Sequence, residues 1–161
     1  MESRFNLREA TNADIAAVKA LVFSVLEEYA IPRGCGSADA DLDDIEGNYT
    51  RNHGYFTVIE EGSRIVASMG VLRHTNETCE LRKMYSVPEV RGRGLGRYLM
   101  DLALSKARQL GYRRMVLETA SPLIEAIALY KKYGFAEYQP EHIADRCDKA
   151  YEIMLEPGGG D

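Results

Sequence analysis

The most informative stretch of this chain is Val87-Pro-Glu-Val-Arg91-Gly92-Arg93-Gly94-Leu95-Gly96-Arg97-Tyr98. A strand-like run leads into three glycines at alternate positions, and an amphipathic helix begins among them. Glycine lets the backbone come close to a ligand, and a helix start presents unpaired amides and the positive end of its dipole. Three arginines add cationic donors at the same place. The stretch therefore predicts an anion site suited to a phosphate or diphosphate, with a plain turn before a helix as the alternative.

The spacing of the glycines excludes two familiar phosphate-binding motifs. A dinucleotide fingerprint needs Gly-x-Gly-x-x-Gly, but counting from Gly92 puts Arg97 at the third glycine, and counting from Gly94 puts Leu99 there. A P-loop needs Gly-Lys followed by serine or threonine, which the sequence lacks. The usual binding modes of nicotinamide dinucleotides and nucleoside triphosphates therefore do not fit.

Strand and helix patterns surround this stretch on both sides. Thr11 and Asp14 have the spacing of a capping box, so a long helix is expected from there to about Tyr29. Ser121 and Pro122 are typical of a later helix start, as N-cap and first helical residue. Periodicity predicts strands over 5–9, 55–59, 64–72, 78–87, 115–119 and 151–155, a short strand from Phe135, and helices over 11–29, 39–46 (short and acidic), 95–110 and 121–133.

Length and composition restrict the class of protein. The 161 residues fit a single domain, expected over 1–156 and followed by a flexible tail at 157–161. A net charge of −5 argues against nucleic acid as a partner, and no run approaches the roughly 18 apolar residues of a membrane helix. The start lacks a secretory signal and the three cysteines fit no disulfide framework, so a cytoplasmic location is expected. The three scattered histidines predict no metal site.

Two motifs at this separation resemble one known family. The stretch after the strand is similar to the acetyl-CoA-binding motif of the GNAT superfamily of N-acetyltransferases, Arg/Gln-x-x-Gly-x-Gly/Ala, here Arg91-x-x-Gly94-x-Gly96. A later helix of the family ends in Leu-Tyr-x-x-x-Gly-Phe, and this chain has Ala126-Ile-Ala-Leu-Tyr130-Lys-Lys-Tyr-Gly134-Phe135. In this chain Glu80-Leu-Arg-Lys-Met-Tyr is similar to the strand that precedes the first motif in many members of the family. The order of the expected elements also matches that of the family over nearly the whole chain.

The resemblance implies an α/β (α+β) fold. The expected architecture is a mixed, mostly antiparallel sheet of six to seven strands, flanked by helices. Two central parallel strands, over 78–87 and 115–119, are expected to splay apart and admit the cofactor.

The resemblance also implies how acetyl-CoA, as cosubstrate, is held. Its pantetheine arm would pair with the backbone of the preceding strand, and its diphosphate would lie on the loop and helix start. Ser86 stands where many members have valine, a change that the backbone contacts should survive. Leu123 stands where many members have asparagine, so one cofactor contact is expected to be missing there. The cofactor-binding residues expected in this way are Met84, Tyr85, Ser86, Arg91, Gly92, Arg93, Gly94, Leu95, Gly96 and Arg97.

The implied reaction is direct attack of a primary amine on the thioester in a ternary complex. A lysine-like amine has a pKa of about 10.4 in water, so a base or a water chain leading to one is useful. Glu80 occupies the strand position where some protein-acetylating members carry a catalytic glutamate. By alternation along the strand, we expect its side chain on the same face as Met84 and Ser86.

Other interpretations of this strand stay open. Glu80 can instead pair with Arg82 or Lys83, or be solvated, and Glu118 on the next strand is a second candidate for the base. A covalent acyl-enzyme on the adjacent Cys79 is disfavoured, because alternation puts that thiol on the opposite face of the strand.

Tyr130 matches the family's tyrosine that protonates the departing thiolate. A phenol with a pKa of about 10 can donate to a thiolate whose conjugate acid has a pKa near 8.5. The alternative is an aromatic residue that packs within a helix stripe.

The acceptor is expected to be a primary amine of a small molecule or a protein. Residues 32–40 and the acidic run Asp39–Glu46 are candidates for the wall of its site. Clustered carboxylates could attract a cationic amine, although such a run is also typical of a solvated helix face. An acyl-CoA-binding sensor without turnover and an enzyme for a longer acyl-CoA are the alternative functions. Dimers are common among relatives, so the sequence leaves a homodimer open.

Overall fold

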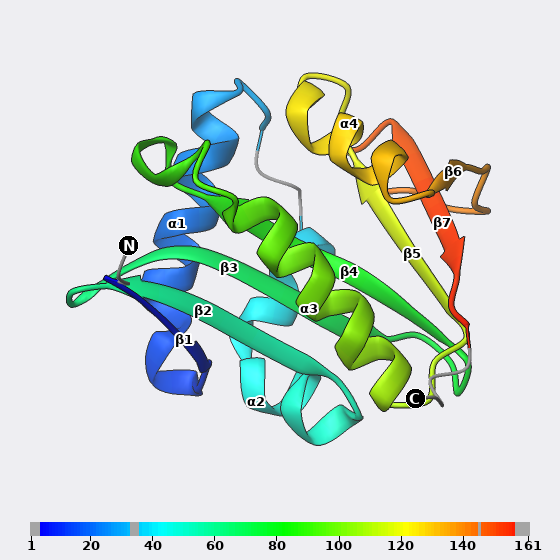
Figure 1. Cartoon of the computed structure of the whole chain (residues 1–161), viewed down its shortest axis with the longest axis horizontal. Coiled ribbons are helices and arrows are strands. Elements are labelled where there is room, and N and C mark those ends of the chain that lie inside the picture. Colours follow the sequence, from blue (N-terminus) through cyan, green and yellow to red (C-terminus); the bar gives the residue numbers. More distant parts are fainter. Residues whose placement is uncertain (1–3, 33–35, 145, 157–161) are drawn as a thin grey trace.

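Seven strands form one sheet in the order β1-β2-β3-β4-β5-β7-β6 (Figure 1). The structure, a computed structural model, describes residues 4–32, 36–144 and 146–156, so the predicted tail at 157–161 lies outside the described residues. Each neighbouring pair of strands is antiparallel except β4 and β5, which run parallel. Helices α1 and α2 cover one face of the sheet, and α3 and α4 cover the other. The predicted fold class is confirmed.

The boundaries of the elements follow the predicted periodicity with few exceptions. The strands are β1 (Phe5–Glu9), β2 (Tyr55–Glu61), β3 (Arg64–Arg73), β4 (Thr78–Ser86), β5 (Arg114–Thr119), β6 (Ala136–Glu137) and β7 (Lys149–Met154). The α-helices are α1 (Ile15–Glu28), α2 (Ile45–Asn48), α3 (Leu95–Gln109) and α4 (Ile124–Lys132). The 3-10 helices are η1 (Asn12–Asp14), η2 (Gly36–Asp43), η3 (Thr50–Asn52) and η4 (Pro88–Val90).

Apolar side chains pack against both faces of the sheet. On one side α3 buries a stripe with helical spacing, made of Leu99, Met100, Ala103, Leu104 and Ala107, against β3 and β4. On the other side the apolar residues of α1 and α2 pack on the sheet. Within the described part of the chain, no helix has the length and apolar character that crossing a membrane requires.

Three predicted local features can be compared with the structure. The capping box of Thr11 and Asp14 is present, and it caps η1, which continues into α1. The acidic segment forms η2 and then the short α2 rather than one helix. The predicted cap at Ser121 is wrong, because α4 begins at Ile124 and the hydroxyl and amide of Ser121 donate instead to Asp148, at 2.6 and 2.9 Å.

The two parallel strands separate after a short ladder, as predicted. Pairing of β4 with β5 ends at Glu80 opposite Val116, whereas β5 stays paired with β7 as far as Thr119. In Figure 1 the two strands consequently diverge toward their carboxyl ends. β4 also contains a bulge: Lys83 has φ of +58° and the register with β3 shifts there. The buried hydroxyl of Ser68 donates to the carbonyl of Lys83 at 2.7 Å and holds the bulge in place.

Candidate active site

The glycine loop presents its backbone to open space. Gly92 and Gly94 have φ of +80° and +84°, a left-handed conformation that glycine adopts without strain. A Cβ at either position would meet no atom within 4 Å. α3 begins directly after Gly94, and among the described residues no acceptor is recorded for the amides from Gly92 to Arg97. Six unpaired amides at a helix start have the geometry of an anion site.

Arg91 holds this loop in position. Its guanidinium donates to both carboxylate oxygens of Glu28 at the end of α1, at 2.6 and 2.8 Å, and to the carbonyl of Ser86 at 2.7 and 3.1 Å. These hydrogen bonds to Glu28 raise the pKa of Arg91. Its side chain therefore fixes the loop to α1 and to the end of β4. The other two arginines of the stretch, Arg93 and Arg97, are exposed. The guanidinium of Arg93 lies 5.8 Å from the ring centroid of Phe5 and 4.0 Å from the carboxylate of Glu61.

A groove of about 350 Å³ leads from the loop along β4. One wall is β4 at Met84, Tyr85 and Ser86, and the opposite wall is the start of α4. At its inner end the groove meets a smaller cavity of about 90 Å³, and both are lined by Met84, Tyr85, Leu123 and Ala126. The groove and the cavity thus form one path from the free amides into the gap between β4 and β5.

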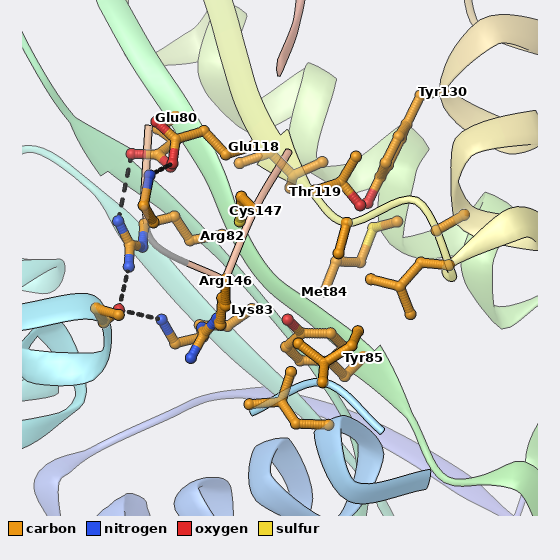
Figure 2. A pocket seen from close by; sticks show the side chains of 18 residues that line it. Glu80, Arg82, Lys83, Met84, Tyr85, Glu118, Thr119, Tyr130, Arg146 and Cys147 are labelled. Atoms are coloured by element: carbon orange, nitrogen blue, oxygen red, sulfur yellow. Dashed lines mark hydrogen bonds and ion pairs between the residues drawn. The ribbon is translucent and has the colours of Figure 1, made fainter. Parts of the chain in front are cut away.

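Tyr130 closes one side of the inner cavity (Figure 2). Its ring is buried against Phe135 and Tyr151, with centroids 5.9 and 6.2 Å away. In Figure 2 its side chain points toward Thr119 and Met84. Burial raises the pKa of Tyr130 above its ordinary value of 10, so the phenol stays protonated near neutral pH.

Glu80 lines the same cavity and is buried. Its Oε1 lies 2.7 Å from Nε2 of His74 and 3.5 Å from Nη1 of Arg82. Glu80 thus forms the ion pair with Arg82 that was the predicted alternative. The ammonium of Lys83 pairs with Asp41 instead.

The prediction that Glu80 shares a strand face with Met84 and Ser86 is wrong. Residues directly opposite each other in an antiparallel ladder lie on the same face. Glu80 pairs with Leu72 and Tyr85 pairs with Ser68, and these two partners lie on one face of β3. Glu80 and Tyr85 therefore share a face. Ser86 pairs with Ala67 and lies on the other face. The bulge adds one residue and so inverts the alternation. Glu80 and Met84 nevertheless both line the cavity.

Cys79 lies on the face opposite to Glu80, as predicted. Its thiol is buried in the core beneath α3, and burial raises its pKa to about 12. A thiol in this state is a poor nucleophile.

Glu118 and a loop from the C-terminal half complete the cavity. Oε1 of Glu118 accepts a hydrogen bond of 2.9 Å from the amide of Ala144, and Cys147 stands nearby in the same wall (Figure 2). Burial, and then the charge of Glu118, raise the pKa of the Cys147 thiol to about 11. No pattern in this loop indicated that it reaches the site.

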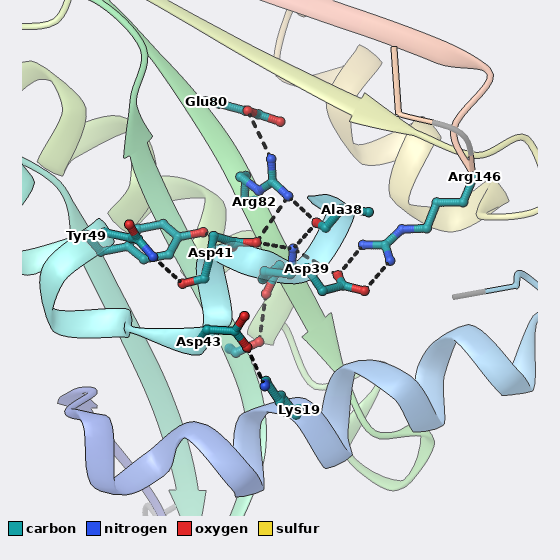
Figure 3. Close-up of polar contacts among 12 residues, drawn as sticks. Lys19, Ala38, Asp39, Asp41, Asp43, Tyr49, Glu80, Arg82 and Arg146 are labelled. Carbon is teal, nitrogen blue, oxygen red and sulfur yellow. Dashed lines mark hydrogen bonds and ion pairs between the residues drawn. The ribbon is translucent and has the colours of Figure 1, made fainter. Parts of the chain in front are cut away.

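The acidic segment η2 binds the chain's own cations (Figure 3). The carbonyl of Ala38 accepts from Nη2 of Arg82 at 2.6 Å and from Nζ of Lys83 at 3.3 Å. Asp41 accepts from the same two side chains at 3.3 and 3.1 Å. Because the bulge turns Lys83 to the same side as Arg82, both cations of β4 reach this segment.

Arg146 joins this cluster from the other side of the cavity. It forms a two-point ion pair with Asp39, with both contacts at 2.8 Å, and Nζ of Lys83 lies 3.2 Å from the same carboxylate. Burial, and then the charge of Arg82, lower the pKa of Lys83. Asp43 pairs with Lys19 at 2.6 Å. Cations of the chain itself therefore engage the carboxylates of Asp39, Asp41 and Asp43 in this acidic run.

Known proteins resemble the chain in sequence and in fold. A sequence profile described as the Acetyltransferase (GNAT) family matches residues 22–135. The N-acetyltransferase YjgM of Escherichia coli is 37% identical over 143 residues, covering 85% of this chain and 82% of that protein. An N-acetyltransferase of Schizosaccharomyces pombe is 30% identical and covers 79% of each chain.

Solved structures give the same answer for the fold. A GNAT-family acetyltransferase of Staphylococcus aureus has a TM-score of 0.87 at 23% identity, covering 94% of this chain and 99% of that one. An acetyltransferase of Salmonella typhimurium, solved with its cofactor acetyl-CoA, has a TM-score of 0.72 at 20% identity, covering 98% of each chain.

Proposed function

The chain belongs to the Acetyltransferase (GNAT) family, and from this premise we propose that it transfers an acetyl group from acetyl-CoA to a primary amine of a small molecule or a protein. One observation carries the proposal. Six unpaired amides at the start of α3 open onto a groove that leads to the buried side chains of Glu80 and Tyr130. Anion binding and acid–base groups thus lie at the two ends of one path.

The residues present fit coenzyme A. The amides from Gly92 to Arg97 would hold its diphosphate, and the exposed side chains of Arg93 and Arg97 would add charge-assisted contacts. The edge of β4 at Met84, Tyr85 and Ser86 would lie along the pantetheine arm. The bound cosubstrate would supply an activated acetyl group at the inner cavity.

Two side chains would move protons during the transfer. Glu80 takes a proton from the acceptor amine, which must lose it to form the amide. Tyr130 gives its hydroxyl proton to the departing thiolate, and its raised pKa keeps that proton in place beforehand. Glu118 remains the second candidate for the base, because it lines the same cavity.

Thioester consumption with a panel of amines, together with calorimetric titration of coenzyme A, tests the proposal. We expect saturable binding and amine-dependent turnover. Binding without turnover for any amine would favour the sensor, and thermal shifts with acetyl-, propionyl- and succinyl-CoA would show whether a longer acyl donor fits better.

Tyr130→Phe tests the acid. We expect kcat to fall about 100-fold, in the usual range for a lost general acid, with little change in the affinity for coenzyme A. Tyr133→Phe is the matched control, since this tyrosine ends the same helix and its hydroxyl contacts Asp101 at 2.7 Å on the surface. Equal activity of the two variants would contradict the role of Tyr130.

A further inference from the structure

The buried carboxylate of Glu80 has one partner that reaches solvent. His74 lies in the turn between β3 and β4, where its amide donates to the carbonyl of Thr78 at 2.9 Å. Its Nε2 is 2.7 Å from Oε1 of Glu80. The side chain of His74 is 42% exposed, whereas that of Glu80 is 8% exposed. The imidazole therefore connects the carboxylate inside the cavity with water outside the molecule.

A buried base must pass its proton on before the next turnover. The second side chain on Oε1 of Glu80 is Arg82, which stays charged and cannot take up a proton. Among the described residues, Oε2 of Glu80 has no recorded hydrogen bond, so this oxygen is the one free to face an acceptor amine. The route from Glu80 to water then leads through the histidine.

We propose that His74 is a positioning residue for Glu80 and carries the substrate-derived proton from that carboxylate to solvent. This inference rests on the proposed function, in which Glu80 is the base. As positioner, the ring holds Oε1 so that Oε2 faces the cavity. As carrier, it must bind and release a proton within the pH range in which the enzyme turns over.

The proton balance needs no further reactant. Glu80 takes one proton from the acceptor amine and becomes a neutral acid. In the resting state the neutral imidazole carries its proton on Nε2 and donates it to Oε1 of the carboxylate. Once Glu80 is neutral, exchange with water moves the imidazole proton to Nδ1, and Nε2 then accepts the carboxyl proton, presented on Oε1. The imidazolium releases the proton on Nδ1 to water, which restores the resting state. One proton leaves the amine and appears in solvent, and Tyr130, which has given its proton to the thiolate, regains one from water. A neutral amine and acetyl-CoA therefore become an amide and coenzyme A with no net change in protons.

Other titratable and charged groups near Glu80 fit this task less well. Histidine is the residue type whose charge ordinarily changes between pH 5 and 8. Burial raises the pKa of Cys79 to about 12 and of Cys147 to about 11, and it also raises those of Tyr49 and Tyr138. The groups near Glu80 on the surrounding elements are Arg82 on β4, Tyr49 after α2, Glu118 on β5, Tyr138 after β6 and Cys147 before β7. Cys79 is its neighbour in β4, on the other face of the strand.

The test compares His74→Gln with His142→Gln at saturating acetyl-CoA. Glutamine can still donate to Oε1 but cannot carry a proton, and His142 is an exposed histidine outside the cavity lining. We expect His74→Gln to lower kcat about 10-fold or more, to leave KM for acetyl-CoA unchanged, and to alter the acid limb of the pH profile. His142→Gln should keep the wild-type profile.

Chemical rescue separates proton transfer from structure. In His74→Ala, added imidazole should raise kcat in proportion to its concentration, while Glu80→Gln should not respond. If His74→Gln keeps the wild-type kcat and pH profile, the inference is overturned. It is also overturned if His74→Ala is impaired, is not rescued by imidazole and is restored by glutamine, because a structural role then suffices.

Failure of the inference can be told from failure of the proposed function. If Glu80→Gln retains full activity, the base is misassigned and the premise fails. If Glu80→Gln is inactive while His74→Gln is unimpaired, only the role of His74 fails.

Discussion

Replacing Gly94 by alanine tests ligand binding separately from folding. Gly111→Ala is the control, because it introduces the same backbone strain at the other end of the same helix. Gly94 precedes α3 with φ of +84°, and Gly111 follows it with φ of +94°. A Cβ at either position meets no atom within 4 Å in the protein itself. Both variants therefore carry a backbone penalty and no steric clash within the chain.

The two variants are expected to lose similar amounts of unfolding free energy but to differ in their affinity for coenzyme A. A left-handed conformation costs an L-residue about 1–2 kcal/mol, partly offset because alanine restricts the unfolded chain by about 0.4–1 kcal/mol. We expect each variant to lose roughly 1 kcal/mol of unfolding free energy. At Gly94 the new methyl group also enters the space beside the free amides. Losing one hydrogen bond to a charged phosphate costs about 1.5–3 kcal/mol, which raises Kd about 10- to 100-fold.

Two measurements decide the matter. Urea unfolding should show similar losses of stability for Gly94→Ala and Gly111→Ala. Titration calorimetry with coenzyme A should show weakened binding for Gly94→Ala only. If both variants bind coenzyme A like the wild type, the backbone from Gly92 to Arg97 is not the diphosphate site and the proposed function loses its main support.

Three further predictions concern stability, loop order and reactivity. Hydrogen bonds from Arg8 hold the pKa of Asp14 below its ordinary 3.8, so the carboxylate stabilises the fold above that pH and its contribution is lost as the pH falls through the folded pKa. Asp14→Asn should therefore lower the unfolding free energy by about 1 kcal/mol at pH 7. The difference from the wild type, measured by urea unfolding, should shrink below pH 3.8. Arg91→Ala should raise Kd for coenzyme A about 10-fold, the equivalent of about 1.4 kcal/mol, because the loop loses its link to Glu28, and an unchanged Kd would show that the loop is ordered without this contact. Cys79, with a pKa of about 12, should resist iodoacetamide at pH 8 until the chain is unfolded in urea, and rapid labelling of the native protein, measured by mass spectrometry, would contradict its burial.

The sequence predicted those parts of the site that depend on local chemistry. The glycine loop and the start of α3 follow from residues adjacent in the chain, so their positions and their free amides could be anticipated. The expected strand and helix are present, and Glu80 and Tyr130, which they carry, line one cavity. The separation of β4 from β5 was expected from the resemblance.

The parts that could not be predicted depend on distant pairs. Arg91 looked like a free phosphate ligand, but its partner Glu28 lies 63 residues away. The ion pair of Arg146 with Asp39 spans 107 residues. No periodicity encodes such contacts, since they arise only when separate elements pack together.

The bulge at Lys83 was not predicted for a different reason. A lysine gives no local sign of a positive φ, so simple alternation put Glu80 on the wrong face. One signal was present: Ser68 is a polar residue within the apolar run of β3, and its hydroxyl satisfies the carbonyl that the bulge leaves unpaired. A buried serine opposite an irregular strand is a reason to doubt strict alternation.

The open edge of β4 and the glycine loop are best understood as one surface. β4 keeps its ladder with β3 as far as Ser86, and β5 keeps its ladder with β7 as far as Thr119, so only the inner ladder between β4 and β5 is broken. An unpaired strand edge offers backbone donors and acceptors to an extended ligand, and the loop that follows offers free amides to an anion. Both kinds of contact are made by the main chain. We therefore expect affinity to depend more on the backbone geometry at Gly94 than on the side chain of Ser86, for a ligand with an amide-containing arm and a diphosphate. The serine in place of the family's valine is compatible with such binding.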